Sequence, residues 1–308
     1  MHSKSLLQTL SKFLFLFFAI LYASSLHAAT PGNGRGIWFW QSPESPFGST
    51  AVVGNSNRED IAIANLKKWG VTAVYGSYQP KEGVAAIRAW NRKLAANGIT
   101  SYRLFADIDD LFPECWPATI DKLRNQFIEF NKNAEPQERF QGIAFDIEPH
   151  IFRGSQRHTS WKSASGSDRR AYIEDLLLVL ENTRTLLDQN AEQNVRIQTS
   201  LTTWYYRLDG SIQWRDHADR DQWFARLAHS CDRVSIMDFE TASTSTILRR
   251  RQDEGTYLAG KSRIALRANL GQEWLTISQF WSAINAVEAI TGDSVDIQSY
   301  AILAQGIH

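Results

Sequence analysis

Residues 142–150, with the sequence GIAFDIEPH, place two carboxylates two positions apart at the end of an apolar run. The run reads as a buried β-strand, and side chains alternate along a strand, so Asp146 and Glu148 project from the same face. A carboxyl group that lies deep in a protein beside a second one keeps its proton to a higher pH. Such a group can protonate a glycosidic oxygen as a general acid. We therefore expect Glu148 to be the general acid/base of a catalytic site, with Asp146 supporting it.

A structural role is the alternative for this pair of carboxylates. Asp146 could form an ion pair with Arg103 or Arg267 and stabilise the protein interior, where unpaired polar groups are costly. That role would leave the second carboxylate, Glu148, without an explanation, so we favour the catalytic interpretation.

The segments that must position these carboxylates alternate regularly along the chain after residue 35. Amphipathic segments such as 84–96, 171–187 and 277–290 have apolar residues at helical spacing. Between them lie short β-branched or aromatic runs, which we predict to be strands: 36–41, 71–78, 101–107, 142–148, 195–203, 233–240, 263–269 and 295–302. Eight such units predict an α/β fold, a parallel sheet closed into a (β/α)8 TIM barrel whose last helix is short or missing. An open doubly wound sheet is less consistent, because the first strand–helix turn lacks a G-x-G-x-x-G motif.

Further polar residues lie near the carboxyl ends of the predicted strands, where the active sites of TIM barrels are found. Alternation predicts that several polar sets point into the barrel: Arg103, Asp107 and Asp109 on the third strand, Gln198, Ser200, Thr202 and Trp204 on the fifth, Asp238 and Glu240 on the sixth, and Arg267 and Asn269 on the seventh. Asp107 could instead be a solvated helix-start residue. The run Arg249-Arg250-Arg251 is expected to be a solvated helix face.

Aromatic side chains near strand ends could stack on the apolar faces of sugar rings. Together with the polar sets above, they define the predicted substrate-binding residues: Trp204, Asp238, Asp107, Tyr205, Arg267, Tyr300 and Trp40. We interpret Trp38 as a core residue and His150 as an exposed loop residue. The loop at 150–168, which contains Trp161, has the Gly, Ser, Arg and His content of a mobile flap.

Two stretches resemble the chitinase-like barrels of glycoside hydrolase family 18. The fourth-strand signature of that family, D-G-x-D-x-D-x-E, is matched at Gly142, Asp146 and Glu148, while Gln141 and Ala144 replace its first two aspartates. Residues 237–240, with the sequence MDFE, are similar to the family's sixth-strand M-x-Y-D, with Phe239 for Tyr and Glu240 for Asp. The resemblance implies that Glu148 is the acid/base, that Asp146 orients a substrate acetamido group as the nucleophile, and that Glu240 helps to hold that group.

Two other groups of sugar-cleaving barrels match smaller parts of the pattern. The letters DIE on a barrel strand also resemble the family-25 lysozyme-type muramidases. The letters IEP resemble the NEP motif of a large clan of retaining glycosidases, which would require a second glutamate at the end of the seventh strand. Glu273 lies slightly beyond that position.

Properties of the whole chain limit the classes of function. Residues 1–29 have a basic start, an apolar stretch and a small-residue end, which predict a secretory signal peptide before one barrel domain at 30–308. We therefore expect export to the periplasm or the extracellular space, with no membrane association after cleavage. The formal net charge of zero gives no reason to expect a nucleic-acid partner. Cys115 and Cys231 are predicted near opposite ends of the barrel and so to be separate thiols.

The resulting expectation is an exported glycoside hydrolase that acts on a polysaccharide or an amino-sugar oligosaccharide. The alternatives are a barrel that binds glycan without cleaving it, a lysozyme-type muramidase, and a metal-dependent deacetylase or phosphodiesterase. The sequence contains no histidine pair at metal-ligand spacing, so we expect neither a metal nor a cofactor.

Overall fold

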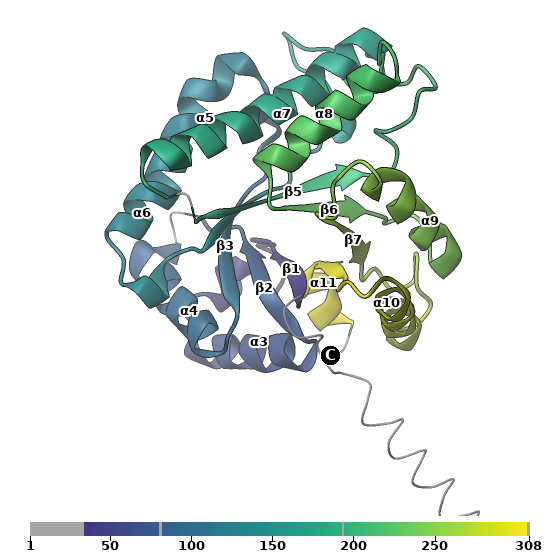
Figure 1. Cartoon of the computed structure of the whole chain (residues 1–308). Coiled ribbons are helices and arrows are strands. Elements are labelled where there is room, and N and C mark those ends of the chain that lie inside the picture. Colours follow the sequence, from purple (N-terminus) through teal and green to yellow (C-terminus); the bar gives the residue numbers. More distant parts are fainter. Residues whose placement is uncertain (1–33, 80–81, 193, 307–308) are drawn as a thin grey trace, which may run out of the picture.

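The computed structural model describes residues 34–79, 82–192 and 194–306, and shows a closed barrel of eight parallel strands (Figure 1). The predicted signal peptide at 1–29 lies outside the described residues. Each strand pairs with its neighbours in sequence, and β1 pairs with β8. The strands are β1 (Arg35–Phe39), β2 (Val71–Gly76), β3 (Thr100–Phe105), β4 (Gly142–Phe145), β5 (Arg196–Thr202), β6 (Arg233–Met237), β7 (Ser262–Arg267) and β8 (Asp296–Gln298). The predicted (β/α)8 architecture is confirmed.

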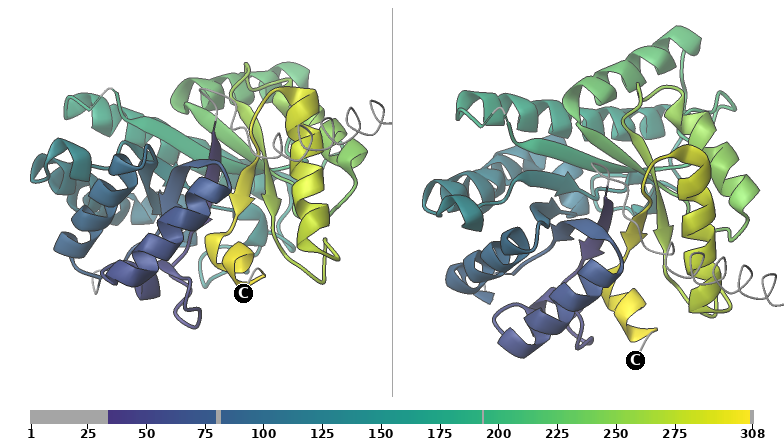
Figure 2. Two further views of the ribbon diagram at one scale, coloured as in Figure 1. Left: turned by 90° about the horizontal axis from the view of Figure 1, so that it is seen from below. Right: turned by 60° about the horizontal axis from the view of Figure 1, so that its bottom comes forward.

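Helices surround the barrel, as the views from two further directions show (Figure 2). They are α2 (Ser49–Val52), α3 (Ser56–Lys68), α4 (Val84–Ala96), α5 (Trp116–Leu123), α6 (Glu129–Lys132), α7 (Gly166–Gln189), α8 (His217–Ser230), α9 (Thr244–Gly255), α10 (Ile277–Thr291) and α11 (Tyr300–Gln305). A π-helical turn, Arg124–Ile128, joins α5 to α6. The final helix, α11, has six residues, so the prediction of a short last helix is confirmed. None of the helices in the described part of the chain is long and apolar enough to span a bilayer.

Side-chain alternation on β4 and β5 follows the prediction. Ile143, Phe145 and Ile147 pack in the large apolar layer between the strands and the helices. Ala144 belongs instead to a second apolar cluster, with Trp38 of β1 and Leu104 of β3. This second cluster fills the barrel interior, so Asp146, in phase with Ala144, points inward.

The predicted phase is wrong for β3 and β6. Tyr102 and Leu104 of β3 and Met237 of β6 fill the barrel interior, so the residues between them face outward. Arg103 therefore reaches the layer of helices, where its Nη2 donates to the carbonyl of Tyr78 at 2.8 Å. Apolar side chains from these two strands complete the interior cluster, and the polar residues find their partners outside it.

The outward phase of β6 also changes the interpretation of the arginine run on α9. Asp238, directly after β6, accepts a hydrogen bond from Nη1 of Arg250 at 2.5 Å. Arg251 forms an ion pair with Asp293. Two of the three arginines therefore have specific partners, and only Arg249 lies on an exposed helix face as expected.

The amino-terminal end of the barrel is closed by a buried polar network around Asp296, which is 0% exposed. Its Oδ1 accepts the backbone N–H of Gly36 at 2.8 Å, and its Oδ2 accepts the hydroxyl of Ser235 at 2.6 Å. Nη1 atoms of Arg233 and Arg263 lie 4.0 Å from Oδ1. The network ties β1, β6, β7 and β8 together at the end of the barrel opposite to Glu148.

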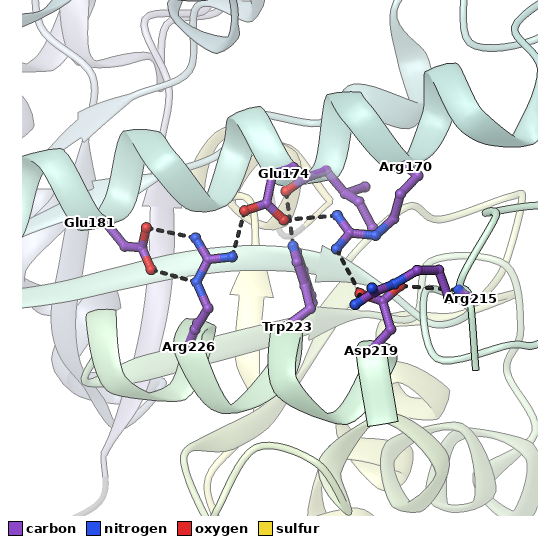
Figure 3. A network of polar contacts seen from close by, with 8 residues as sticks. Arg170, Glu174, Glu181, Arg215, Asp219, Trp223 and Arg226 are labelled. Carbon is purple, nitrogen blue, oxygen red and sulfur yellow. Dashed lines mark hydrogen bonds and ion pairs between the residues drawn. The ribbon is translucent and has the colours of Figure 1, made fainter. Parts of the chain in front are cut away.

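Ion pairs join α7 to α8 on the outside of the barrel (Figure 3). Arg226 contacts Glu174 at 2.5 Å and Glu181 at 2.8 Å, so one guanidinium bridges two carboxylates on the neighbouring helix. Beneath them, the indole N–H of Trp223 donates to the carbonyl of Ile173 at 3.2 Å. These contacts hold α7 against α8, and α7 begins directly after the loop that carries Trp161.

Both cysteines are free thiols. Cys231 is buried before β6, whereas Cys115 is partly exposed after β3. The prediction of two separate thiols is confirmed.

Candidate active site

The two carboxylates follow β4 directly and lie at the carboxyl end of the barrel. The backbone N–H of Asp146 donates to the carbonyl of Phe105 at 2.9 Å, which continues the β3–β4 pairing one residue beyond β4. Glu148 precedes the short 3₁₀ helix η6 (Pro149–Ile151). Asp146 is 5% exposed and the Glu148 side chain is 18% exposed, so both carboxyl groups are largely removed from water.

Burial dominates the electrostatics of Asp146. Burial raises the pKa of this carboxyl and outweighs the lowering by the hydroxyl of Ser200 and the indole N–H of Trp38, so the resulting pKa is about 6. Neither polar group forms a well-aligned hydrogen bond with Asp146, whose buried Oδ1 has no partner among the described residues. An unpartnered carboxyl oxygen in the barrel interior is available to a proton or to a ligand donor.

Glu148 keeps its proton to a higher pH than Asp146. Its burial and, to a smaller extent, the negative charge of Asp146 together raise the pKa of Glu148 to about 8. The two groups titrate as a pair. At neutral pH the pair therefore holds a proton on Glu148, the carboxyl nearer to solvent, while Asp146 is ionised beneath it.

His150 contacts Glu148, although the sequence led us to expect an exposed loop residue. Its Nε2 lies 3.3 Å from Oε2 of Glu148, and its side chain is mostly buried. Burial lowers the pKa of His150 to about 4, so the ring is neutral at pH 7 and the contact is not an ion pair. Because the imidazole is neutral, it places no positive charge beside Glu148 that would lower the raised pKa of that carboxyl.

Aromatic side chains form one wall beside the carboxylates. The ring centroid of Trp204 lies 6.0 Å from that of His150 and 5.6 Å from that of Trp161. Trp161 is buried, and its backbone N–H donates to the carbonyl of Phe152 at 3.0 Å. The predicted mobile flap at 150–168 is therefore wrong at this point, because the loop packs into the wall. Trp204 is half-buried and remains the aromatic residue of the wall that a sugar could reach.

Tyr205 and Tyr300 do not present a ring to the site. Tyr205 is buried beneath Trp204, with its hydroxyl within range of the backbone of His150. Tyr300 packs between β1 and α3, where its ring lies 5.3 Å from that of Phe39 and 5.6 Å from that of Trp69. Both tyrosines therefore support the structure around the barrel instead of stacking on a ligand.

The predicted residues of β6 and β7 have partners of their own or lie in solvent. Glu240 is 83% exposed, with its nearest cationic partner, Arg250, at 4.0 Å. Asp238 is held by Arg250, and Arg267 forms an ion pair with Glu273. This pairing also occupies Glu273, the glutamate considered for the retaining clan. Phe239, between the two acidic residues, packs against the apolar interior of the barrel.

A groove of about 520 Å³ lies over the carboxyl ends of β1, β2 and β3, beside β4. Trp40 and Asp107, two of the predicted substrate-binding residues, line it together with Tyr78 and Leu104. Asp107 also accepts the backbone N–H of Asp109 at 3.1 Å and lies 3.3 Å from Lys122, so it is in addition a helix-start residue. The groove and Glu148 both lie at the carboxyl end of the barrel, and the residues that line the groove do not include Asp146, Glu148 or Trp204.

Glu254 is a buried carboxyl group that the sequence gave no reason to select. It lies on α9, within a run of charged residues, and is 0% exposed. Its Oε1 accepts the backbone N–H of Tyr206 at 3.4 Å, and burial raises its pKa to about 8. It supports the turn that carries Trp204 and Tyr205. Within the described residues, no group of three or more His, Cys, Asp or Glu side chains could hold a metal ion.

The raised pKa of Glu148 predicts a stability change in Glu148→Gln. The folded-state pKa exceeds the value of about 4.3 for an exposed glutamate, so the stability that the protonated group contributes is lost progressively as the pH rises from about 4.3 to about 8. Glutamine cannot ionise. We expect the variant to unfold with nearly unchanged free energy at pH 5, and to be about 1–3 kcal/mol more stable than the wild type at pH 9.

Urea unfolding at both pH values would measure this difference, with the exposed Glu44→Gln as the control. Equal effects of Glu148→Gln at pH 5 and pH 9 would show that Glu148 is ionised in the folded protein at neutral pH.

Comparison with known proteins agrees with the fold. No protein-family model matches the chain, and no curated protein sequence matches it. A fungal endo-beta-N-acetylglucosaminidase of glycosyl hydrolase family 18 is similar in structure, with a TM-score of 0.52 and 10% identity over 86% of this chain and 89% of that one. A Bacteroides thetaiotaomicron VPI-5482 protein assigned as an alpha-L-fucosidase has a TM-score of 0.50 and 10% identity over 88% and 87% of the two chains. The chain therefore has the TIM-barrel fold that these glycoside hydrolases share, at an identity that indicates wide divergence.

Proposed function

We propose that this protein is a glycoside hydrolase in which Glu148 is the general acid/base and Asp146 supports it. The observation that carries the proposal is the pair of buried carboxyl groups at the carboxyl end of β4. Burial and the neighbouring charge keep Glu148 protonated at neutral pH, and its side chain is the more exposed of the two. A carboxyl that keeps its proton at neutral pH and is partly open to solvent is what cleavage of a glycosidic bond requires.

In the proposed reaction, Glu148 donates its proton to the glycosidic oxygen as the bond to the anomeric carbon breaks. The ionised Glu148 then removes a proton from the water that completes hydrolysis, which restores the starting state. Asp146, ionised beneath it, favours the oxocarbenium character of the transition state by its negative charge. Neutral His150 contacts Glu148 without neutralising it.

The reaction also requires a nucleophile at the anomeric carbon. A substrate that contains an amino sugar fits this requirement best. Glu240 points into solvent, so the described part of the chain offers no third carboxylate at this site. An acetamido group on the substrate, oriented by the unpartnered Oδ1 of Asp146, would serve as the nucleophile, as the family-18 resemblance implies. Phe239 cannot replace the tyrosine hydroxyl of that family, so Asp146 would hold the acetamido group with fewer partners.

Trp204 and the groove define where the sugar units would bind. Trp204 offers an apolar ring beside Glu148, and the groove over β1 to β3 has room for neighbouring units against Trp40. We therefore propose a substrate of several sugar units that contains N-acetylated hexosamine. The pattern of residues 1–29 supports action outside the cytoplasm, in the periplasm or the extracellular space, where such polysaccharides occur.

Glycan cleavage by the purified protein tests the proposal. Wild type and Glu148→Gln would be incubated with chitooligosaccharides, peptidoglycan and exopolysaccharides, and the products analysed by mass spectrometry. We expect the wild type to release an amino-sugar product, and the variant to lose at least about 10³-fold in rate while it remains folded.

Two other outcomes would change the assignment. Cleavage that survives Glu148→Gln would remove Glu148 from the chemistry. Binding of a glycan by both proteins with no cleavage by either would identify a glycan-binding barrel, a function that the outward Glu240 and the missing tyrosine hydroxyl would then explain.

A further inference from the structure

The groove over the carboxyl ends of β1, β2 and β3 contains a buried positive charge that the proposed reaction does not use. Arg103 of β3 lines this groove and is 8% exposed. The groove borders the strand that leads to the two carboxylates, because its lining residue Phe105 pairs with Phe145 and accepts the backbone N–H of Asp146. Its volume of about 520 Å³ lies within the range of about 300–1,000 Å³ that is usual for small-molecule sites.

Arg103 differs from the other buried arginines in the part of the chain that the structure describes. Buried arginines are normally paired with a carboxylate. Three of these four arginines form ion pairs of 4.0 Å or less: Arg35 with Glu288, Arg220 with Asp221, and Arg263 with Asp296. Arg103 forms no ion pair with any described residue, so its counter-charge is missing from the folded chain described here.

Neutral groups surround the guanidinium of Arg103. Its Nη2 donates to the backbone carbonyl of Tyr78 at 2.8 Å and to the side-chain oxygen of Gln126, and its buried Nη1 has no hydrogen-bond partner among the described residues. Glu82 is the carboxylate whose charge acts on Arg103, from beyond ion-pair distance, and it accepts the hydroxyl of Thr50 at 3.0 Å. Burial lowers the pKa of Arg103 to about 10, so the side chain is positively charged at neutral pH.

The remainder of the groove is suited to sugar hydroxyls. Nζ of Lys122 lies 3.3 Å from a carboxylate oxygen of Asp107 and 2.7 Å from one of Asp110. Oδ2 of Asp110 has no partner in the described structure and can accept a hydroxyl, while the half-buried Trp40 offers an aromatic surface for a sugar ring. Among the described lining residues two cations stand against two carboxylates, so a single carboxylate beside Arg103 suits the groove better than a group with several negative charges.

We infer that this groove binds a sugar unit that carries a carboxylate, with the carboxylate next to Arg103 and the hydroxyls toward Asp107 and Asp110. A guanidinium presents paired N–H donors that match the two oxygens of a carboxylate. The inference rests on the proposed function in that the ligand is a glycan, and it deepens that function by naming an acidic glycan as the substrate class. The carboxylate is either at C6 of the sugar, as in glucuronate, or on an ether-linked lactate, as in N-acetylmuramic acid.

Calorimetric titration of the purified protein with defined oligosaccharides tests the inference. One probe is a hyaluronan hexasaccharide, in which glucuronate alternates with N-acetylglucosamine, and the other is a peptide-free glycan strand that contains N-acetylmuramic acid. Each probe is compared with its own methyl ester, which has the same sugars without the charge. We expect the wild type and Glu148→Gln, which prevents cleavage of the probe, to bind at least one acid form about tenfold or more tightly than its ester.

Variants of Arg103, made in the Glu148→Gln background, assign this preference to the groove. Arg103→Gln should bind the acid form at least about tenfold more weakly and the ester within about twofold, while Arg103→Lys keeps the charge and part of the preference. Arg88→Gln is the matched control, because Arg88 also lies over an aromatic ring, 5.5 Å from that of Phe130, and does not line the groove. Circular dichroism checks folding, and if Arg103→Gln does not fold, Arg103→Lys and the comparison of acid with ester in the wild type remain decisive.

The outcomes separate this inference from the proposed hydrolysis. Equal affinity for acid and ester with both probes, no binding of either acid, or an acid preference that Arg103→Gln leaves intact would overturn the inference. An acid preference with the hyaluronan probe alone assigns a uronic acid, and one with the muramic acid strand alone assigns the lactate. Acidic probes that bind through Arg103 without any cleavage would support the acidic-glycan groove and contradict hydrolysis, whereas cleavage of chitooligosaccharides without an acid preference would do the reverse.

Discussion

Replacing Asp296 with asparagine should lower the free energy of unfolding by about 3–5 kcal/mol, because it removes the buried negative charge between the buried Arg263 and the partly buried Arg233. The carboxylate accepts hydrogen bonds from the Gly36 N–H and the Ser235 hydroxyl, and lies 4.0 Å from Nη1 of both Arg233 and Arg263. Asparagine is similar in size, yet its amide nitrogen would place a donor where the structure needs an acceptor. Both arginines would lose a counter-charge that they share.

Urea unfolding of the full-length protein at pH 7 measures this loss. Asp121→Asn is the matched control, because Asp121 is highly exposed and its nearest partner is Arg124 at 3.8 Å. Exposed pairs of this kind contribute at most about 1 kcal/mol. A loss below about 1 kcal/mol in Asp296→Asn as well would mean that water, and not Asp296, solvates the two arginines.

The barrel and its central pair of carboxylates could be predicted from the sequence because two periodicities agreed. Strand-like runs separated by helical patterns required a parallel sheet, and the carboxylates stood in phase with Ala144 in a strand whose other residues, Ile143 and Phe145, were large and apolar. Both patterns are satisfied by a barrel in which Asp146 points inward while Ile143 and Phe145 face the helices, and this is the arrangement in the structure.

The same reasoning was wrong for β3 and β6. Along each of these strands, large apolar side chains point to one face and charged side chains point to the other. We assumed that charged residues face the site. In the structure, Leu104 and Met237 fill the interior, while Arg103 and Asp238 meet partners contributed by Tyr78 and Arg250. Those partners come from distant segments, so the sequence of one strand could not reveal them.

The surroundings of Glu148 were predicted least well, because they depend on loops. The contact of His150 with Glu148 and the burial of Trp161 follow from the path of the chain after η6, which no periodic pattern encodes. Glu254 was hidden for a similar reason. Its helix is rich in charged residues and gave no sign that one carboxyl is buried under the turn at Trp204.

Replacing Asp146 with asparagine should reduce the kcat of glycan cleavage by about 10²–10³-fold and move the alkaline limb of the pH profile to lower pH. The charge of Asp146 raises the pKa of Glu148, so its removal lowers that pKa, and Glu148 loses its proton earlier as the pH rises. The alkaline limb reports the ionisation of the general acid, and we expect it to shift down by roughly one pH unit. The acidic limb, which reports ionisation of Asp146, should disappear.

The pH dependence of kcat/KM, measured on the substrate that the glycan survey identifies, would show both changes. Glu240→Gln is the informative control. The family-18 resemblance assigns Glu240 a role in holding the acetamido group, whereas the structure places its side chain in solvent. We expect its profile and rate to match the wild type within about twofold. An alkaline limb that Asp146→Asn leaves in place would mean that another group is the acid, and a large loss in Glu240→Gln would mean that the loop after β6 closes over the substrate.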